Sequence, residues 1–504
     1  MNALLGEIMD TAPGPDAIVV SDSSINYIDT LPLEVLLLLF KQVTTQHPGA
    51  DDPYTITLSH VCARWRRAVE DAPELWSTLF ITPLHDSPSV TRHYLINSKS
   101  LTLDIILDLR NGFFDYISPD IVDSLVENSW RWRRFSLVTP VIDTCLPLYK
   151  ALSAPCLEEL NITVNESMIW LLGHIPSPQP IPATMPSLRT LRLDSFGSPI
   201  AFSLSHITTL ELDSFRSNAS ILRAILSASP ELGTLIMLDF HADLTNSMSE
   251  ISTAPIHASR LTRLATAFSP AHTTLLCPCG LSLIQAPLLQ HLELQFDLIK
   301  DVQGHLSFDT GNRYGNVRFL QLQGLPPVVG IPNRAFPLDA FPSLEYLRLD
   351  EMATFMELAS YFSSSDQTRR CGELSKKLKY IEFESHYPND ARQFFNNLGE
   401  PYCNIPLTVY LPRLPWIAEE IERNSIDLGP SLLVKLAPST SSSLIRERTA
   451  AQASHWLDSD SDSLGELSDA REEASEWVYE SWEDGDDDGE YEEYDEYDDD
   501  FHYD

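Results

Sequence analysis

The chain has 504 residues, more than one simple domain usually holds, and this length predicts two or three structural units. Its hydrophobic content of 43% is ordinary for a globular protein, and its formal charge is −38. Residues 451–504 hold 23 acidic residues against one arginine and account for −22 of that charge. Because phosphate binding needs clustered Lys and Arg, this balance argues against nucleic acid and anionic membranes as partners.

The cysteines and the N-terminus indicate the compartment. Seven scattered cysteines, an odd number without framework spacing, predict reduced thiols in a cytoplasmic or nuclear protein. No signal peptide is predicted, because the first residues lack a basic segment and a continuous apolar run. The longest apolar run, Leu31–Phe40, covers about half of a membrane span of roughly 20 residues. Residues 1–24 are polar, contain Pro and Gly, and are predicted to be a flexible N-terminus.

The sequence LPLEVLLLLF predicts a strongly apolar helix. Pro32 suits its first turn, where a missing N–H costs no hydrogen bond, and Glu34 complements the helix dipole. Apolar residues then surround the helix, which requires burial on every side. TITLSHVCARWRRAVED predicts a second helix with Arg64, Arg66 and Arg67 on a solvent-facing side.

A unit of about 55 residues has too little surface to cover such an apolar helix by itself. We infer from this imbalance that one face of the first helix binds another protein. The alternative is that the body of the chain that follows covers this face.

Residues 25–81 resemble the F-box family. Its pattern of Leu-Pro-x-Glu-hydrophobic, Val-Cys-x-x-Trp and a closing Leu-Trp is present, in order, in LPLEVLLLLF, VCARW and ELW. The polar loop near residues 44–53 is longer than in many members. The resemblance implies that the first helices bind the Skp adaptor of cullin–RING ubiquitin ligases. It implies adaptor contacts at Leu31, Pro32, Val35, Leu36, Leu39 and Phe40. It implies internal packing of Cys62, Trp65, Leu75 and Trp76.

A repeated phrase, Leu-x-x-Leu-x-Leu, runs from about residue 155 to 385. Clear copies are CLEELNI (156–162), SLRTLRL (187–193), HITTLEL (206–212), LLQHLEL (288–294), NVRFLQL (316–322), SLEYLRL (343–349) and KLKYIEF (377–383). Looser copies are ELGTLIM (231–237) and RLTRLAT (260–266). With these included, the copies from residue 237 to 349 end 29, 28, 28 and 27 residues apart, a spacing typical of leucine-rich repeats. Helical patches such as SNASILRAILSAS lie between them, which predicts a parallel sheet with helices outside.

These features together predict an α/β solenoid. The expected units are a small helical F-box domain at 25–81, a leucine-rich-repeat-like parallel β/α arc at 82–440, and a disordered acidic tail at 441–504. We expect the arc to be shallow and irregular. The Asn or Cys usual three places after the last Leu is absent, and Phe196 and Phe215 stand there instead.

The alternate side chains of each Leu-x-Leu strand point away from the core and form a candidate target-binding face. Its residues are Arg192, Asp194, Glu211, Asp213, Glu293, Gln321, Arg348, Asp350 and Glu382. Acids outnumber bases, so we expect this face to bind a protein that is basic or polar. The alternative is a face that is merely soluble.

Other motifs do not carry chemistry. Trp130-Arg131-Trp132-Arg133-Arg134 mixes aromatics with Arg, as nucleic-acid patches do, but we favour packing of Trp130 and Trp132 around a turn. Cys277 and Cys279 have no second Cys pair, so we expect no zinc. No catalytic motif is found, and we expect no catalytic residue, cofactor or metal.

The sequence therefore predicts a substrate-recognition subunit of a Skp–cullin–F-box ubiquitin ligase. It would bridge the adaptor to a protein target and catalyse nothing itself. The alternative is a repeat scaffold with a vestigial F-box and no ligase, and a third hypothesis is an unrecognised enzyme.

Overall fold

The computed structural model of the chain describes residues 27–46, 54–82, 87–109, 117–139, 153–164, 185–194, 204–214, 216–217, 219–242, 255–268, 283–296, 314–324, 340–349, 377–383, 407–411, 432–436 and 444. Asp350, the Cys277–Cys279 pair and residues 1–24 lie outside the described residues. So does the predicted acidic tail, with the exception of Leu444.

The N-terminal region is helical. It comprises η1 (Tyr27–Thr30), α2 (Leu33–Gln46), α3 (Tyr54–Val61), α4 (Ala63–Glu70) and η2 (Pro73–Trp76). The single second helix expected from the sequence is two helices, because Cys62 between them has an extended backbone. The Sγ atom of Cys62 caps α4 by accepting a hydrogen bond from the Trp65 N–H at 3.5 Å.

A large parallel sheet follows. Along the sheet its strands are β1 (Thr78–Ile81), β2 (Leu103–Asp108), β3 (Trp132–Thr139), β4 (Glu159–Val164), β5 (Thr190–Asp194), β6 (Thr209–Asp213), β8 (Thr234–Ala242), β10 (Arg263–Phe268), β12 (His291–Phe296), β13 (Phe319–Gln323), β14 (Tyr346–Leu349), β15 (Tyr380–Phe383), β16 (Leu407–Leu411) and β17 (Leu432–Leu436). The short β7 (Arg216–Ser217) also pairs with β8, and β9 (Ile256–His257) pairs with β11 (Ile284–Gln285) in a second sheet.

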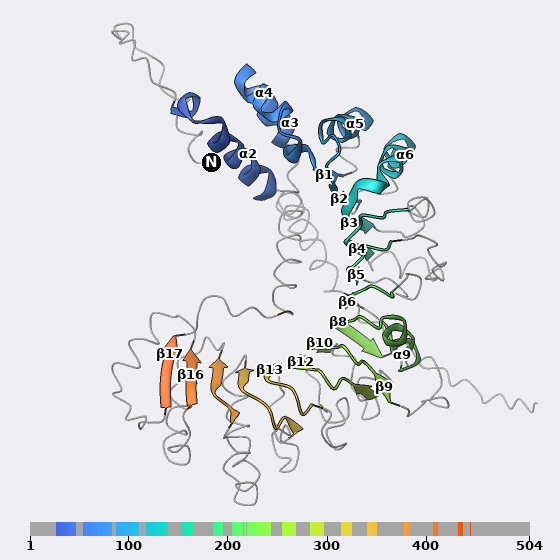
Figure 1. Cartoon of the computed structure of the whole chain (residues 1–504), viewed down its shortest axis with the longest axis vertical. Coiled ribbons are helices and arrows are strands. Elements are labelled where there is room, and N and C mark those ends of the chain that lie inside the picture. Colours follow the sequence, from blue (N-terminus) through green and yellow to red (C-terminus); the bar gives the residue numbers. More distant parts are fainter. Residues whose placement is uncertain are drawn as a thin grey trace, which may run out of the picture.

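The remaining described helices are α5 (Pro88–Asn97), α6 (Pro119–Glu127), η4 (Ser129–Arg131) and α9 (Ala219–Ala228). Figure 1 shows the strands following one another in chain order along a curved row, with α5, α6 and α9 on its outer side. The predicted arrangement, a small helical region followed by a parallel sheet with helices, is confirmed.

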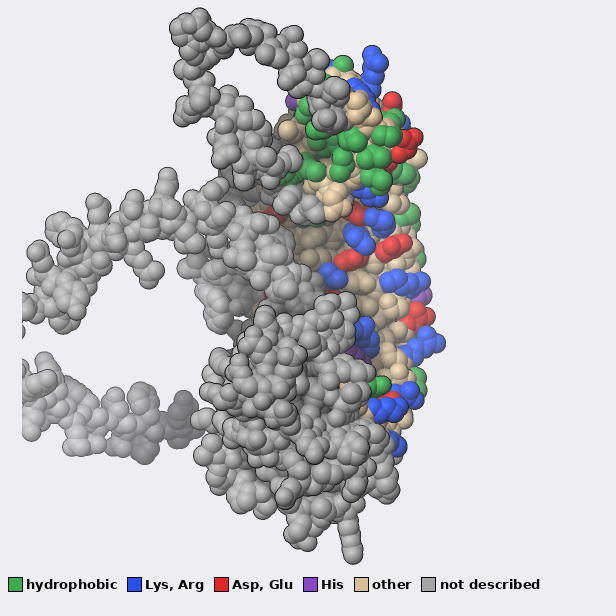
Figure 2. All heavy atoms as spheres, turned by 90° about the vertical axis from the view of Figure 1, so that its left-hand side faces the viewer, with side chains coloured by type: hydrophobic (Ala, Val, Ile, Leu, Met, Phe, Trp, Pro, Cys, Tyr) green, Lys and Arg blue, Asp and Glu red, His purple; other side chains and the backbone are tan. Residues whose placement is uncertain are grey.

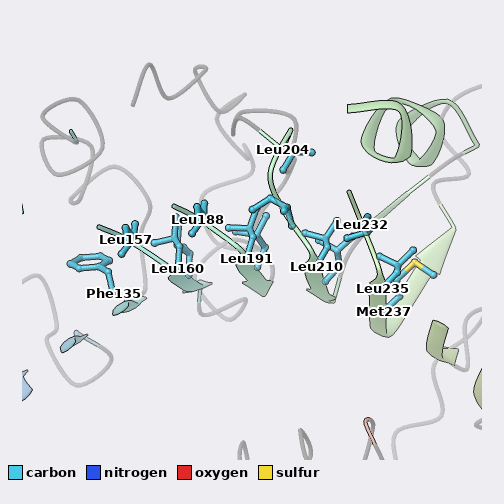
Figure 3. Close-up of a cluster of buried hydrophobic side chains, with 14 of the residues drawn as sticks. Phe135, Leu157, Leu160, Leu188, Leu191, Leu204, Leu210, Leu232, Leu235 and Met237 are labelled. Atoms are coloured by element: carbon cyan, nitrogen blue, oxygen red, sulfur yellow. The ribbon is translucent and has the colours of Figure 1, made fainter. Parts of the chain in front are cut away.

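One row of apolar side chains crosses this sheet in register. It consists of Leu79, Ile105, Phe135, Leu160, Leu191, Leu210, Leu235, Leu264, Leu292, Leu320, Leu347 and Ile381, all buried. Figure 3 shows the central members side by side on successive strands. The row holds the sheet together, because each deleted core leucine side chain costs ~2–5 kcal/mol.

The helical region and the sheet share one hydrophobic core. A single cluster of buried side chains extends from Leu36 in α2 to Ile381 in β15. Trp76 has no exposed surface, and its ring lies 5.0 Å from that of Tyr94 in α5. The first strand, β1, begins two residues after Trp76 and lies inside the range expected for the helical module. The helices are therefore fused to the sheet without a linker.

The Trp-Arg-Trp-Arg-Arg motif is a structural junction. Trp132 is buried and stacks on Phe135 at 4.6 Å, whereas Trp130, expected to pack, is 54% exposed. Arg131 is buried, and its guanidinium donates to the Leu101 carbonyl at 2.8 Å, the Ser98 Oγ at 2.7 Å and the Leu95 carbonyl at 3.3 Å. Burial lowers the pKa of Arg131 from its ordinary value.

We expect Arg131→Ala to lower the free energy of unfolding by about 2–4 kcal/mol, since it leaves several buried acceptors without a donor. Arg92→Ala, an exposed arginine of α5, should change it by less than about 0.5 kcal/mol. Urea denaturation of the two variants measures the difference. Equal midpoints would show that the hydrogen bonds of Arg131 contribute nothing.

Candidate functional site

Helix α2 has an inner and an outer face, both apolar. Leu36 and Phe40 are 1% and 2% exposed, and the ring of Phe40 lies 4.8 Å from that of Trp65 in α4. Val35, Leu38 and Leu39 follow the i, i+3, i+4 spacing on the opposite side, and all three are exposed, Leu38 to 67%. These three residues form the outer stripe of α2.

Other apolar residues of the helical region also reach the surface. Ile28, Leu33 and Val61 are also exposed. Figure 2 shows hydrophobic side chains gathered at the upper end of the described surface, with basic and acidic side chains mixed below them. Soluble proteins rarely expose such a patch without a function, so it indicates a binding surface.

The residues that were expected at the adaptor fall into two groups, one at the surface and one in the core. Pro32, Val35 and Leu39 are exposed and Leu31 is half-buried. Leu36 and Phe40 are core residues instead, because the inner face of α2 needs apolar side chains to attach it to α4. Sequence reasoning missed Leu33 and Leu38. The spacing of Leu38 relative to Val35 and Leu39 was the signal available.

The inner residues hold the helices in place. Leu75 and Trp76, expected in the core, are buried, and the Trp76 Nε1 donates to the Val69 carbonyl at 2.8 Å. Trp65 is half-buried against the core. Arg64, expected on a solvent face, donates through Nη1 to the Ile28 carbonyl at 3.4 Å and through Nη2 to the Leu31 carbonyl. It thus fastens the turn that precedes α2.

Residues 28–82 match the model of the F-box-like family. They form an F-box-like domain. No curated protein sequence matches the chain. The match covers η1 to β1, so the F-box-like domain includes the outer stripe and runs into the sheet.

The sheet beyond the F-box-like domain has a second candidate surface, on the face opposite the leucine row. Six of the residues expected at a target share one line of register across it. They are Arg192, Glu211, Glu293, Gln321, Arg348 and Glu382. We call this line the polar row. Asp194 and Asp213 are paired on the same face, two residues after Arg192 and Glu211 along their strands.

The polar row is less accessible than its sequence suggests. Apart from Arg192, its members are buried. Arg192 pairs with Glu159 at 3.1 Å and with Glu211 at 3.2 Å, and Arg348 pairs with Glu382 at 3.8 Å. Strands ~4.8 Å apart bring such residues within reach of one another, so the Glu211 and Glu382 carboxylates are paired with arginines inside the sheet.

Two further features of this face were not expected. Rings at the starts of three strands stack, with centroids 4.2 Å apart for His291 and Phe319 and 4.9 Å for Phe319 and Tyr346. The ring of Tyr380 on the next strand lies tilted beside that of Tyr346, 5.9 Å away. Between Glu211 and Glu293 the polar row is interrupted by Ile236 and Ala265.

The residues that the structure describes contain no group of three or more His, Cys, Asp or Glu side chains that could hold a metal ion. None of the described helices has the length and apolar character needed to cross a membrane.

Arg348→Met should lower the free energy of unfolding by about 3–5 kcal/mol, because it removes the cation beside the buried Glu382 carboxylate. The matched control is Arg318→Met, which breaks an ion pair to Glu345 whose arginine is 66% exposed and should cost under about 1 kcal/mol. Thermal denaturation at neutral pH compares the two. Similar losses for both variants would contradict a special cost of burial.

Proposed function

We propose that the protein is the substrate-recognition subunit of a Skp–cullin–F-box ubiquitin ligase. The F-box-like domain binds a Skp-type adaptor, and the sheet presents a protein target. The observation that carries this proposal is the outer stripe of α2, an apolar helix face in the F-box-like domain that none of the described residues covers.

The exposed apolar side chains of the outer stripe support a protein partner. Burial of apolar surface contributes roughly 25 cal/mol per Å² before the costs of association, and a small number of apolar anchors usually dominates such an interface. Within this proposal Leu31, Pro32, Val35 and Leu39 contact the adaptor together with Leu33 and Leu38. Leu36 and Phe40 support them from the inner side of the helix.

The mechanism is proximity rather than catalysis. The shared core from Leu36 to Ile381 keeps the F-box-like domain and the sheet in a constant orientation. A target on the sheet would thus stay at a defined distance from the adaptor and from the enzymes it recruits, which raises the effective concentration of the reacting groups. The chain supplies no catalytic residue in this proposal, and it works in the cytoplasm or the nucleus.

We further infer that the sheet is an irregular leucine-rich-repeat solenoid. The spacing of its phrases near 28 residues, the in-register leucine row and the sequential parallel order of the strands support this inference. The second candidate function, a scaffold with a vestigial F-box, uses the same solenoid without the ligase. Retention of an apolar outer stripe favours the first function, because a stripe without a partner is an aggregation hazard.

Adaptor binding is tested with the double variant Val35→Glu/Leu39→Lys in the full chain. It removes two apolar side chains from the outer stripe and adds a Glu–Lys pair at i, i+4, which stabilises an isolated helix. We expect its affinity for a purified Skp-type adaptor to fall at least about thirtyfold, since two anchors of ~1–2 kcal/mol each are lost. Calorimetric titration measures the affinity.

Two control variants accompany this titration. Leu288→Lys changes an exposed leucine outside the F-box-like domain and should leave adaptor affinity unaltered. Leu36→Ala should lower the free energy of unfolding by ~2–5 kcal/mol, as expected of a core residue. If the folded wild-type chain fails to bind the adaptor at micromolar concentration, the ligase proposal is abandoned in favour of the scaffold.

A further inference from the structure

The polar row is interrupted by apolar residues at its centre. Ile236 and Leu238 of β8 and Ala265 and Ala267 of β10 form a small hydrophobic cluster, separate from the main core. The flanking members of the polar row are Glu211 on β6 and Glu293 on β12. Since alanine has no atom beyond Cβ, β10 presents the least side-chain volume of this stretch. We call these four residues the central hollow.

A residue remote in sequence packs against these four residues. Leu444 packs against the cluster, and it comes from a part of the chain more than 140 residues beyond β12. The side chains of the central hollow are all buried. An apolar contact at this point is consistent with the composition of β8 and β10, because a polar occupant would lose its water without gaining a partner.

A carboxylate beside the central hollow holds the backbone of the occupant. The N–H of Leu444 donates to the Glu293 Oε1 at 3.1 Å. The same Oε1 lies 2.6 Å from the Nε2 of His291, and the Glu293 side chain has no exposed surface. Hydrogen bonds to a charged acceptor are stronger than neutral ones. The bond to Leu444 involves its backbone N–H and not its side chain.

We propose that the central hollow is a docking site for a leucine-bearing segment, and that Leu444 of this chain occupies it in cis. Recognition consists of one apolar side chain over Ala265 and Ala267 and one backbone N–H on Glu293. A cis occupant is favoured by its high effective concentration, so it competes strongly with any segment from outside.

The docking site rests on the proposed function, and it affects how a target would bind. A target that docks through a leucine on this face has to displace Leu444, so the chain carries its own competitor for the target. The outer stripe of α2 lies on a different element and takes no part in this contact. Adaptor binding and segment docking are therefore separable.

The experiment uses a fluorescent peptide of residues 439–450, STSSSLIRERTA, and the full-length chain. The receptor variant Leu444→Asp removes the occupant from the central hollow and places a carboxylate near Glu293. We expect the peptide to bind this variant at least about tenfold more tightly than wild type, the minimum for freeing one buried leucine site. Fluorescence polarisation measures the affinity.

Two matched variants make the test specific. A peptide with aspartate at the position of Leu444 should bind neither receptor. Adding Ala267→Leu to the Leu444→Asp receptor fills the central hollow and should reduce peptide affinity about tenfold or more. If Leu444→Asp lowers the melting temperature, Leu444→Ala serves as the receptor with the same expectation.

Two outcomes would overturn the proposal. One is a folded Leu444 variant that does not bind the peptide. The other is equal peptide affinity for wild type, for the Leu444 variant and for its Ala267→Leu derivative. Adaptor titration on the same proteins should be unchanged. Loss of adaptor binding alone would count against the ligase, and loss of peptide binding alone would count against the central hollow.

Discussion

The in-register row of leucines and related side chains is the constraint on which the rest of the structure depends. Because each member of the row lies opposite the corresponding member of the next strand, from Leu79 to Ile381, neighbouring strands have one register that buries all of them. A slip by one residue would turn the row to the opposite face and expose it. The same register brings the polar row into line on the other face.

This row also explains why the F-box-like domain is not a separate unit. Trp76, between α4 and β1, packs on His93 and Tyr94 of α5, and β1 supplies the first member of the row. A hinge at this point would expose Trp76 and the neighbouring core. The outer stripe of α2 and the polar row therefore keep a constant relation, which suits a protein proposed to hold two partners near each other.

Acidic and basic side chains alternate and form ion pairs along part of the sheet. Glu159 lies between Arg134 and Arg192, at 3.4 and 3.1 Å, and Arg192 reaches on to Glu211. The paired carboxylates Glu159 and Glu211 are thus engaged within the sheet. The interruption at Ile236 and Ala265 is the place where the chemistry of this face changes, and it is where Leu444 lies.

The sequence by itself determined that a small helical region precedes a parallel sheet, and it determined the positions of the strands at the leucine phrases. The Pro32 and Cys62 motifs indicated the F-box-like domain, and the spacing of the leucine phrases indicated parallel strands one repeat apart. These features are local, since helix starts, caps and strand patterns depend on residues a few positions apart.

Only the tertiary structure decided which face of α2 is inner, because a helix that is apolar all round carries no such information. It also decided that Glu211, Glu293 and Glu382 are buried and partnered, and that Leu444 packs against the central hollow. Burial and pairing arise between strands and segments that are distant in the chain, and no local pattern records them.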